Sequence, residues 1–335
     1  GMSTLYVVDP RARVKREGAT LLVQVGGKTK LRARLDELAR CVLAGQSWIS
    51  RPALEGLLAR GIDTVLLDRG GGYVGRVAGP EGAHVELRLA QAAAVGDSAV
   101  CLRLARAMVV AKIRNCRRVI GRTKRAKEVP GVAALLAELN AARVAAQAAE
   151  TLESLRGWEG QAAALYFKAL RRLFPVDLGF KRRRRRPPPD PVNALLSLGY
   201  TLVGAELAGA VRAVGLDAHL GFLHRPLRGR ESLALDLLEV FRPEAVDRLT
   251  LVLLRGRHLQ SKDFEPAEEA GGLRLRQESF RDYLEAYEAH MSRSALRGPQ
   301  RNKRSLSLRE YLHIQARELR RAIESGERFR AYLTH

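Results

Sequence analysis

In the first ninety residues, short runs of aliphatic and β-branched residues alternate with glycine and proline. Runs of this length, bounded by such residues, predict β-strands. The predicted strands span residues 5–8, 13–17, 20–25, 64–67 and 73–77, and the last two flank a glycine-rich turn as in a hairpin. One helix interrupts them. It begins at Ser50, a favourable N-cap followed by Pro52, and ends at Gly61.

From about residue 90 the pattern changes to alanine, leucine and arginine spaced for one face of a helix. Two segments, residues 181–191 and 261–272, interrupt it. The pattern predicts an α+β protein with a small N-terminal β-rich domain, residues 2–90, and a larger all-α domain, residues 91–335. The predicted helices cover residues 98–120, 130–154, 157–174, 191–214, 230–240, 244–255, 277–290 and 307–325.

The net charge of the chain indicates its binding partner. The 58 lysine and arginine residues against 36 aspartate and glutamate residues give a formal net charge of +22. An excess of this size attracts polyanions and makes binding salt-dependent. A membrane is the weaker alternative, since no helix joins a basic face to bulky aromatic residues and apolar runs such as residues 233–238 are too short to span a bilayer. Nucleic acid is therefore the expected partner, with no membrane.

Three basic stretches concentrate this charge. Residues 103–127 hold ten basic residues and no acidic one, residues 181–186 are six consecutive cations, and residues 293–304 form a third cluster. A single run is usually solvated surface, but three uncompensated runs in one domain favour contacts with phosphates. Few aromatic residues are interleaved, which favours a duplex over a stacked single strand. The expected DNA contacts are Lys112, Arg114, Arg117, Arg118, Arg183, Arg184, Arg185 and Arg186.

The three cysteines, Cys41, Cys101 and Cys116, stand singly in apolar or helical surroundings. An odd number without a Cys-x-x-Cys pair predicts neither a disulfide framework nor a thiolate zinc site. This usage fits a reduced compartment, so we expect the protein in the cytoplasm.

Glu159 lies in an otherwise apolar helical stripe that includes Ala162, Tyr166 and Leu170. Taken alone, it is typical of a first-turn glutamate favoured by the helix dipole.

Asp236 and Glu239 stand three residues apart in a segment that is apolar almost all round, so they share one helix face. Two buried like charges repel each other and need a cation, which either an arginine or a metal ion would supply. His224 precedes this helix, and a lone histidine there is more often a satisfied core residue. Taken together, the carboxylates and the imidazole suit Mg²⁺ or Mn²⁺, and such an ion in a basic domain predicts phosphodiester chemistry.

Six segments stand in order along the chain: LYVV (5–8), AKIRN (111–115), GWEGQAAALYF (157–167), PPPDPVNALLSLGYTL (187–202), the segment from Gly215 through GFLH (215–224) and GRESLALDLLEVFRP (229–243). With them the chain resembles the CRISPR-associated integrase, the first CRISPR-associated protein, which inserts new spacers into a CRISPR array. The resemblance covers nearly the whole chain, and the ordered set is far more specific than any one segment.

The resemblance implies an N-terminal β domain that forms a homodimer and a helical catalytic domain with a divalent-metal site. The metal ligands of the family fall on Glu159, His224 and Glu239, with Asp236 as a neighbouring acid, and which of the last two binds directly stays open. The implied reaction is transesterification, in which the 3′-OH of an incoming double-stranded protospacer attacks a phosphodiester of the CRISPR repeat. Water in place of that hydroxyl gives nuclease activity. The implied partner is the second CRISPR-associated protein, a small dimer that bridges two integrase dimers in the prokaryotic cytoplasm.

Two alternatives stand beside this hypothesis. A free-standing branched-DNA nuclease or mobile-element integrase would use the same residues, and only the genomic neighbourhood separates it from a spacer integrase. A non-catalytic nucleic-acid binder is compatible with the composition. It gives no reason for Glu159, Asp236 and Glu239 to lie on apolar faces.

Overall fold

The computed structural model describes residues 3–80, 82, 84–268, 271–293 and 306–334. The chain divides into two compact units. The first comprises Gly1–Ala83 with Leu275–Arg281, and the second comprises His84–Arg274 with Asp282–His335. The division therefore falls near the domain boundary predicted at residue 90, and one later segment joins the first unit.

The first unit contains two four-stranded sheets. One sheet has the strand order β1-β5-β7-β8, with β1 (Ser3–Val7), β5 (Leu38–Ala44) and β7 (Asp63–Leu67) parallel and β8 (Tyr73–Val77) antiparallel to β7. Alternate residues of these strands, such as Leu5 and Cys41, are buried in the core of the unit.

The second sheet has the order β4-β3-β2-β6, formed by β4 (Lys28–Arg34), β3 (Thr20–Val25), β2 (Arg13–Glu17) and β6 (Trp48–Ile49). β4 was not predicted, because its sequence KTKLRAR is exposed at nearly every position and lacks an apolar face. Lysine and arginine on such an edge strand discourage further strand pairing.

The helix predicted after Ser50 is confirmed as α1 (Arg51–Ala59). The Ser50 hydroxyl accepts a hydrogen bond from the backbone N–H of Ala53 at 3.3 Å and so caps its first turn. α1 connects β6 to β7.

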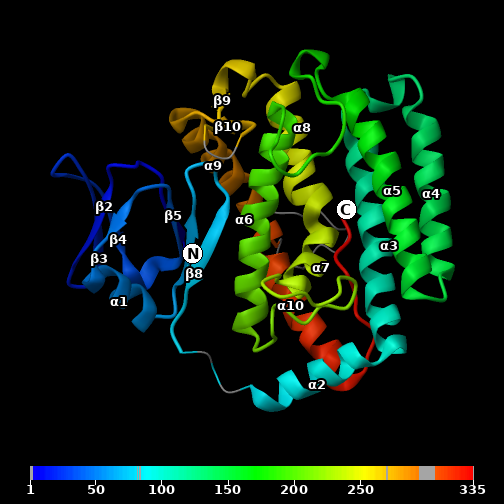
Figure 1. Cartoon of the computed structure of the whole chain (residues 1–335), viewed down its shortest axis with the longest axis horizontal. Coiled ribbons are helices and arrows are strands. Elements are labelled where there is room, and N and C mark those ends of the chain that lie inside the picture. Colours follow the sequence, from blue (N-terminus) through cyan, green and yellow to red (C-terminus); the bar gives the residue numbers. More distant parts are fainter. Residues whose placement is uncertain (1–2, 81, 83, 269–270, 294–305, 335) are drawn as a thin grey trace. The chain divides into compact units, whose positions relative to one another are not determined.

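The second unit is mostly helical (Figure 1), so the predicted α+β class, strand-rich first and helical afterwards, is confirmed. α3, α4 and α5 pack against one another, and α3 and α6 both pack against α7. α2 was not predicted, and the helix predicted over 130–154 ends early because Thr151 caps α5. A short strand, β9 (Phe264–Pro266), lies in the predicted loop and pairs with β10 (Leu273–Leu275), which follows directly after that loop. The helices are α2 (Val85–Gly96), α3 (Ser98–Arg122), α4 (Val132–Ala148), α5 (Leu152–Leu173), α6 (Pro191–Ala213), α7 (Ser232–Phe241), α8 (Arg248–Arg255), α9 (Gln277–Ser292) and α10 (Leu308–Ser325).

α6 is a long helix of this unit and is buried over most of its length. Among the described residues it alone is long and apolar enough to cross a membrane. However, 72% of its apolar window is buried within the structure, and the core helix of a soluble protein meets the same criteria. Length and composition therefore give α6 no membrane assignment.

An extended segment follows α10 and returns to α3 (Figure 1). The Asn115 side chain of α3 holds it: Nδ2 donates to the carbonyl of Tyr332 at 3.0 Å, and Oδ1 accepts from the backbone N–H of Thr334 at 2.9 Å. The Tyr332 ring stacks on Phe241 at 4.9 Å between centroids. This segment thus packs against the end of α7.

Candidate active site

α5 carries Glu159 well inside the helix, because α5 begins at Leu152 under the cap of Thr151. The Thr151 hydroxyl accepts from the backbone N–H of Ser154 at 3.1 Å. The interpretation of Glu159 as a first-turn glutamate is therefore wrong, and the helix dipole gives no reason for its position.

α7 buries Asp236 and Glu239 on one face, as predicted from their spacing. Oδ2 of Asp236 accepts the backbone N–H groups of Phe222 at 2.6 Å and Leu223 at 2.9 Å. Oδ1 accepts the backbone N–H of His224 at 2.8 Å and faces its Nδ1 at 2.7 Å. Both oxygens of Asp236 are therefore occupied by the segment that carries His224.

The His224 segment fits closely against the start of α7. A Cβ added at Gly221 would lie 2.8 Å from the backbone and Cβ of Ser232, so only glycine allows this approach. With Nδ1 directed to Asp236, the other ring nitrogen, Nε2, lies 4.0 Å from Oε1 of Glu239. A proton on Nδ1 leaves the Nε2 lone pair free.

Two further side chains fix this segment, and neither was predicted. Arg156, one turn before Glu159 on α5, donates from Nε at 2.9 Å and from Nη2 at 2.7 Å to the carbonyl of Leu223. Gln91 of α2 donates to the carbonyls of Asp217 and Leu220 and accepts from the backbone N–H of Asp217. No signal in the sequence identified Arg156, because the carbonyl that it binds lies far away along the chain.

Lys112 of α3 joins the two glutamates. Its ammonium forms an ion pair with Glu159 and lies 2.5 Å from Oε2 of Glu239. Only 9% of the Lys112 side chain is exposed, so the expectation that it contacts DNA from the surface is corrected. Within a run of basic residues, the sequence alone does not show that Lys112 is buried.

Arg242 provides the second cation, three residues after Glu239. Its guanidinium lies 2.8 Å from Oε1 of Glu239 and stacks 4.6 Å above the Tyr200 ring. Burial alone would raise the pKa of Glu239, but Arg242 and Lys112 outweigh it and lower that pKa to about 2. Glu239 is therefore a carboxylate at neutral pH, and protein cations compensate its charge.

Glu159, His224, Asp236 and Glu239 together form what we call the acid–imidazole cluster. Their side chains differ in how far they are exposed to solvent. The Glu159 and His224 side chains are 24% and 28% exposed, against 4% for Glu239 and 0% for Asp236. A substrate would approach from the side of Glu159 and His224, and the other two acids form the buried floor.

A divalent metal is implied by the donor set. In the described part of the chain, no three His, Cys, Asp or Glu side chains are gathered closely enough to hold an ion as they stand. The chemistry nevertheless fits, since Glu159 and Glu239 both direct carboxylate oxygens at one cation, the Lys112 ammonium, with the imidazole alongside. Asp236 has no comparable freedom because its oxygens already accept four donors.

The predicted DNA-contacting arginines differ in where they point. Arg114, Arg118, Arg184, Arg185 and Arg186 are exposed. Arg117 is half-buried and donates to the carbonyl of Leu136 on α4 at 3.3 Å.

Arg183 turns away from its neighbours in the basic run. It donates to Oδ1 of Asn193 at 2.9 Å and to the Ser197 hydroxyl at 3.1 Å, and it lies 5.3 Å from the centre of the Tyr200 ring. Residues 294–304 of the third basic cluster lie outside the described residues.

Residues 5–289 match the family described as CRISPR associated protein Cas1. CRISPR-associated endonuclease Cas1 2 of Rhodospirillum rubrum is 36% identical over 332 residues, which cover 95% of this chain and 95% of that protein. A CRISPR-associated exonuclease Cas4/endonuclease Cas1 fusion of the same organism is 37% identical over 96% of this chain, and the match spans only 56% of the fusion.

A solved structure of a CAS1 protein from Thermotoga maritima has the same fold, with a TM-score of 0.83 at 24% identity over 98% of this chain and 99% of that one. The family match covers most of the sequence and includes every member of the acid–imidazole cluster. The chain belongs to the CRISPR associated protein Cas1 family.

Proposed function

We propose that this protein is a metal-dependent DNA endonuclease and integrase that inserts new spacers into a CRISPR array. The observation that carries the proposal is the convergence of Glu159 and Glu239 on a single cation beside Nε2 of His224. A buried carboxylate whose pKa is held low, as that of Glu239 is, is more typical of a catalytic site than of a surface that only binds nucleic acid. Membership of a family with relatives named as endonucleases supports the same conclusion.

In the proposed reaction, the 3′-oxygen of an incoming DNA end forms a bond to a phosphorus of the repeat. The bond from that phosphorus to the 3′-oxygen of the preceding repeat nucleotide breaks at the same time. The number of phosphodiester bonds is unchanged, and the proton of the attacking hydroxyl passes to solvent while the leaving oxygen gains one. With water as the nucleophile, the same steps give a 5′-phosphate and a free 3′-OH.

The protein groups supply charge and alignment for this reaction. Glu159, His224 and Glu239 would hold a Mg²⁺ or Mn²⁺ ion, which supplies Lewis-acid polarisation of the phosphate when bound. Asp236 and Arg156 fix the His224 segment from its N–H and carbonyl sides. Arg242 and Lys112 keep Glu239 ionised in the buried floor.

The proposed substrates are double-stranded protospacer ends and the CRISPR repeat, held by the exposed arginines of α3 and of residues 184–186. The proposed assembly is a homodimer that works with the second CRISPR-associated protein, and the proposed location is the prokaryotic cytoplasm. Buried, unpaired Cys41, Cys101 and Cys116 suit a reducing compartment.

A strand-transfer assay tests the proposal. Purified protein, the second CRISPR-associated protein, a labelled duplex with free 3′ ends and a repeat-containing supercoiled plasmid are incubated with Mn²⁺, Mg²⁺ or EDTA. We expect label joined to the plasmid at the repeat in the presence of metal. Label that remains unjoined under all conditions would contradict the proposal.

A further inference from the structure

Both oxygens of Glu239 are held by cations, and the two cations are anchored differently. Arg242 lies 2.8 Å from Oε1, and its guanidinium is stacked over the Tyr200 ring. The Lys112 ammonium lies 2.5 Å from Oε2 and forms its second ion pair with Glu159. Within the residues that the structure describes, these two carboxylates are its only partners in a hydrogen bond or ion pair. The Lys112 ammonium is therefore held in place by the two acids assigned to the metal.

Lys112 is charged at neutral pH, although only 9% of its side chain is exposed. Burial acts to lower its pKa, but the carboxylates of Glu239 and Glu159 outweigh burial and raise that pKa. An ammonium has no lone pair to offer a metal ion. Lys112 therefore competes with a divalent ion for the two carboxylates and does not help to bind it.

A divalent ion and this ammonium cannot share the two carboxylates. Mg²⁺ binds carboxylate oxygens at about 2.0–2.1 Å, so an ion on Oε2 of Glu239 would share that oxygen with the Lys112 ammonium. In this buried position the two cations would repel each other with little screening. In the described part of the chain, no three His, Cys, Asp or Glu side chains are gathered closely enough to hold an ion, as expected while an ammonium joins Glu159 to Glu239. Binding of the ion therefore requires Lys112 to leave.

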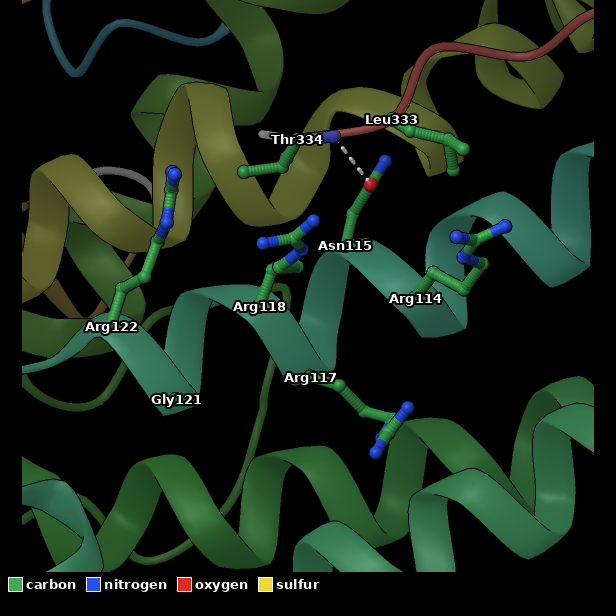
Figure 2. Close-up of a pocket in the computed structure, with 8 residues that line it drawn as sticks. All are labelled: Arg114, Asn115, Arg117, Arg118, Gly121, Arg122, Leu333 and Thr334. Atoms are coloured by element: carbon green, nitrogen blue, oxygen red, sulfur yellow. Dashed lines mark hydrogen bonds between the residues drawn. The ribbon is translucent and has the colours of Figure 1, made fainter. Parts of the chain in front are cut away.

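The Lys112 side chain can leave without movement of α3, because α3 is fastened to α7 beside the cluster. Three residues after Lys112, Nδ2 of Asn115 donates to the carbonyl of Val240 at 2.9 Å, and Val240 directly follows Glu239. Oδ1 of the same amide accepts from the backbone N–H of Thr334 (Figure 2). The four-carbon stem of lysine is flexible, so the ammonium can swing away while both helices stay in place.

We propose that Lys112 is a resident cation that a divalent metal ion displaces from Glu159 and Glu239, so that this lysine sets the metal concentration at which the acid–imidazole cluster binds its ion. The inference rests on the proposed function, because it takes the two glutamates as metal ligands. Before the ion binds, Lys112 offsets the repulsion between the carboxylates and keeps them close together. Arg242 stays with Glu239 throughout. Lys112 is thus a positioning residue, and a permanent structural ion pair is the alternative.

Four variants separate these alternatives. Lys112→Met removes the charge and keeps an unbranched side chain, and Lys112→Arg keeps the charge. Arg242→Met removes a cation from the same glutamate but leaves the Lys112 ammonium in place, so it controls for the loss of charge alone. Lys168→Met, at an exposed position of α5, controls for the loss of a lysine outside the cluster.

Mn²⁺ binding to the full chain is measured from the electron paramagnetic resonance signal of free Mn²⁺ at one pH and one ionic strength. We expect Lys112→Met to bind Mn²⁺ at least about tenfold more tightly than the wild type, because no buried ion pair has to be broken first. Arg242→Met should gain less, and Lys112→Arg and Lys168→Met should gain nothing. No gain in Lys112→Met, or an equal gain in Arg242→Met, would overturn the inference.

The wild-type protein provides a second test, which does not depend on the folding of Lys112→Met. Lysine side chains are reductively methylated in EDTA and in saturating Mg²⁺, and the modification of each lysine is quantified by mass spectrometry. We expect Lys112 to react several-fold faster in Mg²⁺, because its ammonium has left the ion pairs, while the reactivity of exposed Lys168 is unchanged. Equal reactivity of Lys112 in both conditions would mean that it stays in place, and the inference would be wrong.

Failure of the proposed function looks different from failure of this inference. In that case the wild-type protein gives no strand transfer with Mn²⁺, and Glu239→Gln binds Mn²⁺ as tightly as the wild type. If the wild type transfers strands and Glu239→Gln loses Mn²⁺ binding, but Lys112→Met binds Mn²⁺ no more tightly than the wild type, only the displacement of Lys112 is wrong.

Discussion

Nδ1 of His224 lies 2.7 Å from Oδ1 of Asp236, and the same carboxylate accepts three consecutive backbone N–H groups. The Asp236 carboxyl group therefore fixes the position of the His224 segment and directs Nδ1 of the ring toward itself. Nε2, on the other side of the ring, lies 4.0 Å from Oε1 of Glu239. We therefore propose that Asp236 positions the His224 segment and that Glu239, whose partners are the side chains of Lys112 and Arg242, would bind the metal ion.

Asp236→Asn tests this assignment. An amide has one acceptor oxygen where the carboxylate has two, so its NH₂ group must face a donor and His224 loses its fixed tautomer. We expect strand transfer to fall about 10–100-fold, with duplex affinity unchanged. The apparent Mn²⁺ requirement should rise, which a purely structural role would not produce. Complete loss in Asp236→Asn beside a mild loss in Glu239→Gln would exchange the two roles.

The lowered pKa of Glu239 predicts an acid-labile contribution to stability. Its folded pKa of about 2 lies below the ordinary 4.5, so the stabilisation is fully present above pH 4.5 and is lost as pH falls toward 2. The shift corresponds to roughly 3 kcal/mol. We expect Glu239→Gln to flatten the decline in unfolding free energy over this range, measured by urea titration.

Asp247 is the matched control, because it is also a buried acid but its pKa shifts the other way. Burial raises its pKa to about 6, despite hydrogen bonds from the hydroxyls of Tyr200 and Tyr166. Its stabilisation is therefore complete below 3.8 and lost as pH rises through 6. In the wild type this group should make the unfolding free energy fall as pH rises from 4 to 6, and Asp247→Asn should remove that fall. Identical pH profiles of unfolding free energy for Glu239→Gln and Asp247→Asn would contradict the account.

Arg183 and Arg185 are neighbours in one basic run but should behave differently. Arg185 is exposed, so Arg185→Ala should lower the slope of log affinity against log salt by about 0.9. Arg183 and Arg242 lie over the same Tyr200 ring at 5.3 and 4.6 Å, so Arg183→Ala should lower stability and strand transfer with little change in slope. Equal slope changes in both variants would mean that Arg183 also contacts phosphate.

The homodimer is expected to form through the first unit. β8 is an edge strand, and Val74 on it is 64% exposed. We expect Val74→Glu to convert a dimer into a monomer in light scattering at micromolar concentration. Val144→Glu on α4, at a site 53% exposed, is the control and should leave the dimer intact. A wild-type monomer would rule this assembly out.

Much of the fold was predictable because periodicity and caps are local. The spacing of apolar residues gave the long helices, and Ser50 with Pro52 placed the start of α1. Local sequence patterns did not predict the elements whose limits depend on neighbouring strands or helix caps. β4 is exposed and pairs only because β3 offers an edge, and the break between α4 and α5 depends on the cap at Thr151.

In the candidate site, too, some residues could be predicted from local sequence and others could not. Asp236 and Glu239 were recognisable because two carboxylates on an apolar helix face are uncommon, whereas Glu159 and His224 were assigned through the family resemblance. Lys112 was not, since nothing in a run of ten cations identifies the one that faces two carboxylates contributed by α5 and α7. Gln91 and Arg156 act on backbone groups far away in sequence, so only the tertiary structure reveals them.

Strand transfer by Glu159→Gln tests the central claim most directly, with Lys168→Gln on the same helix as control. Glu159 supplies the solvent-facing carboxylate of the cluster, and glutamine keeps its size while removing the charge. The account predicts that Glu159→Gln binds duplex as tightly as the wild type yet joins no label to the repeat plasmid with Mn²⁺, whereas Lys168→Gln remains active. Full Mn²⁺-dependent strand transfer by Glu159→Gln would contradict it.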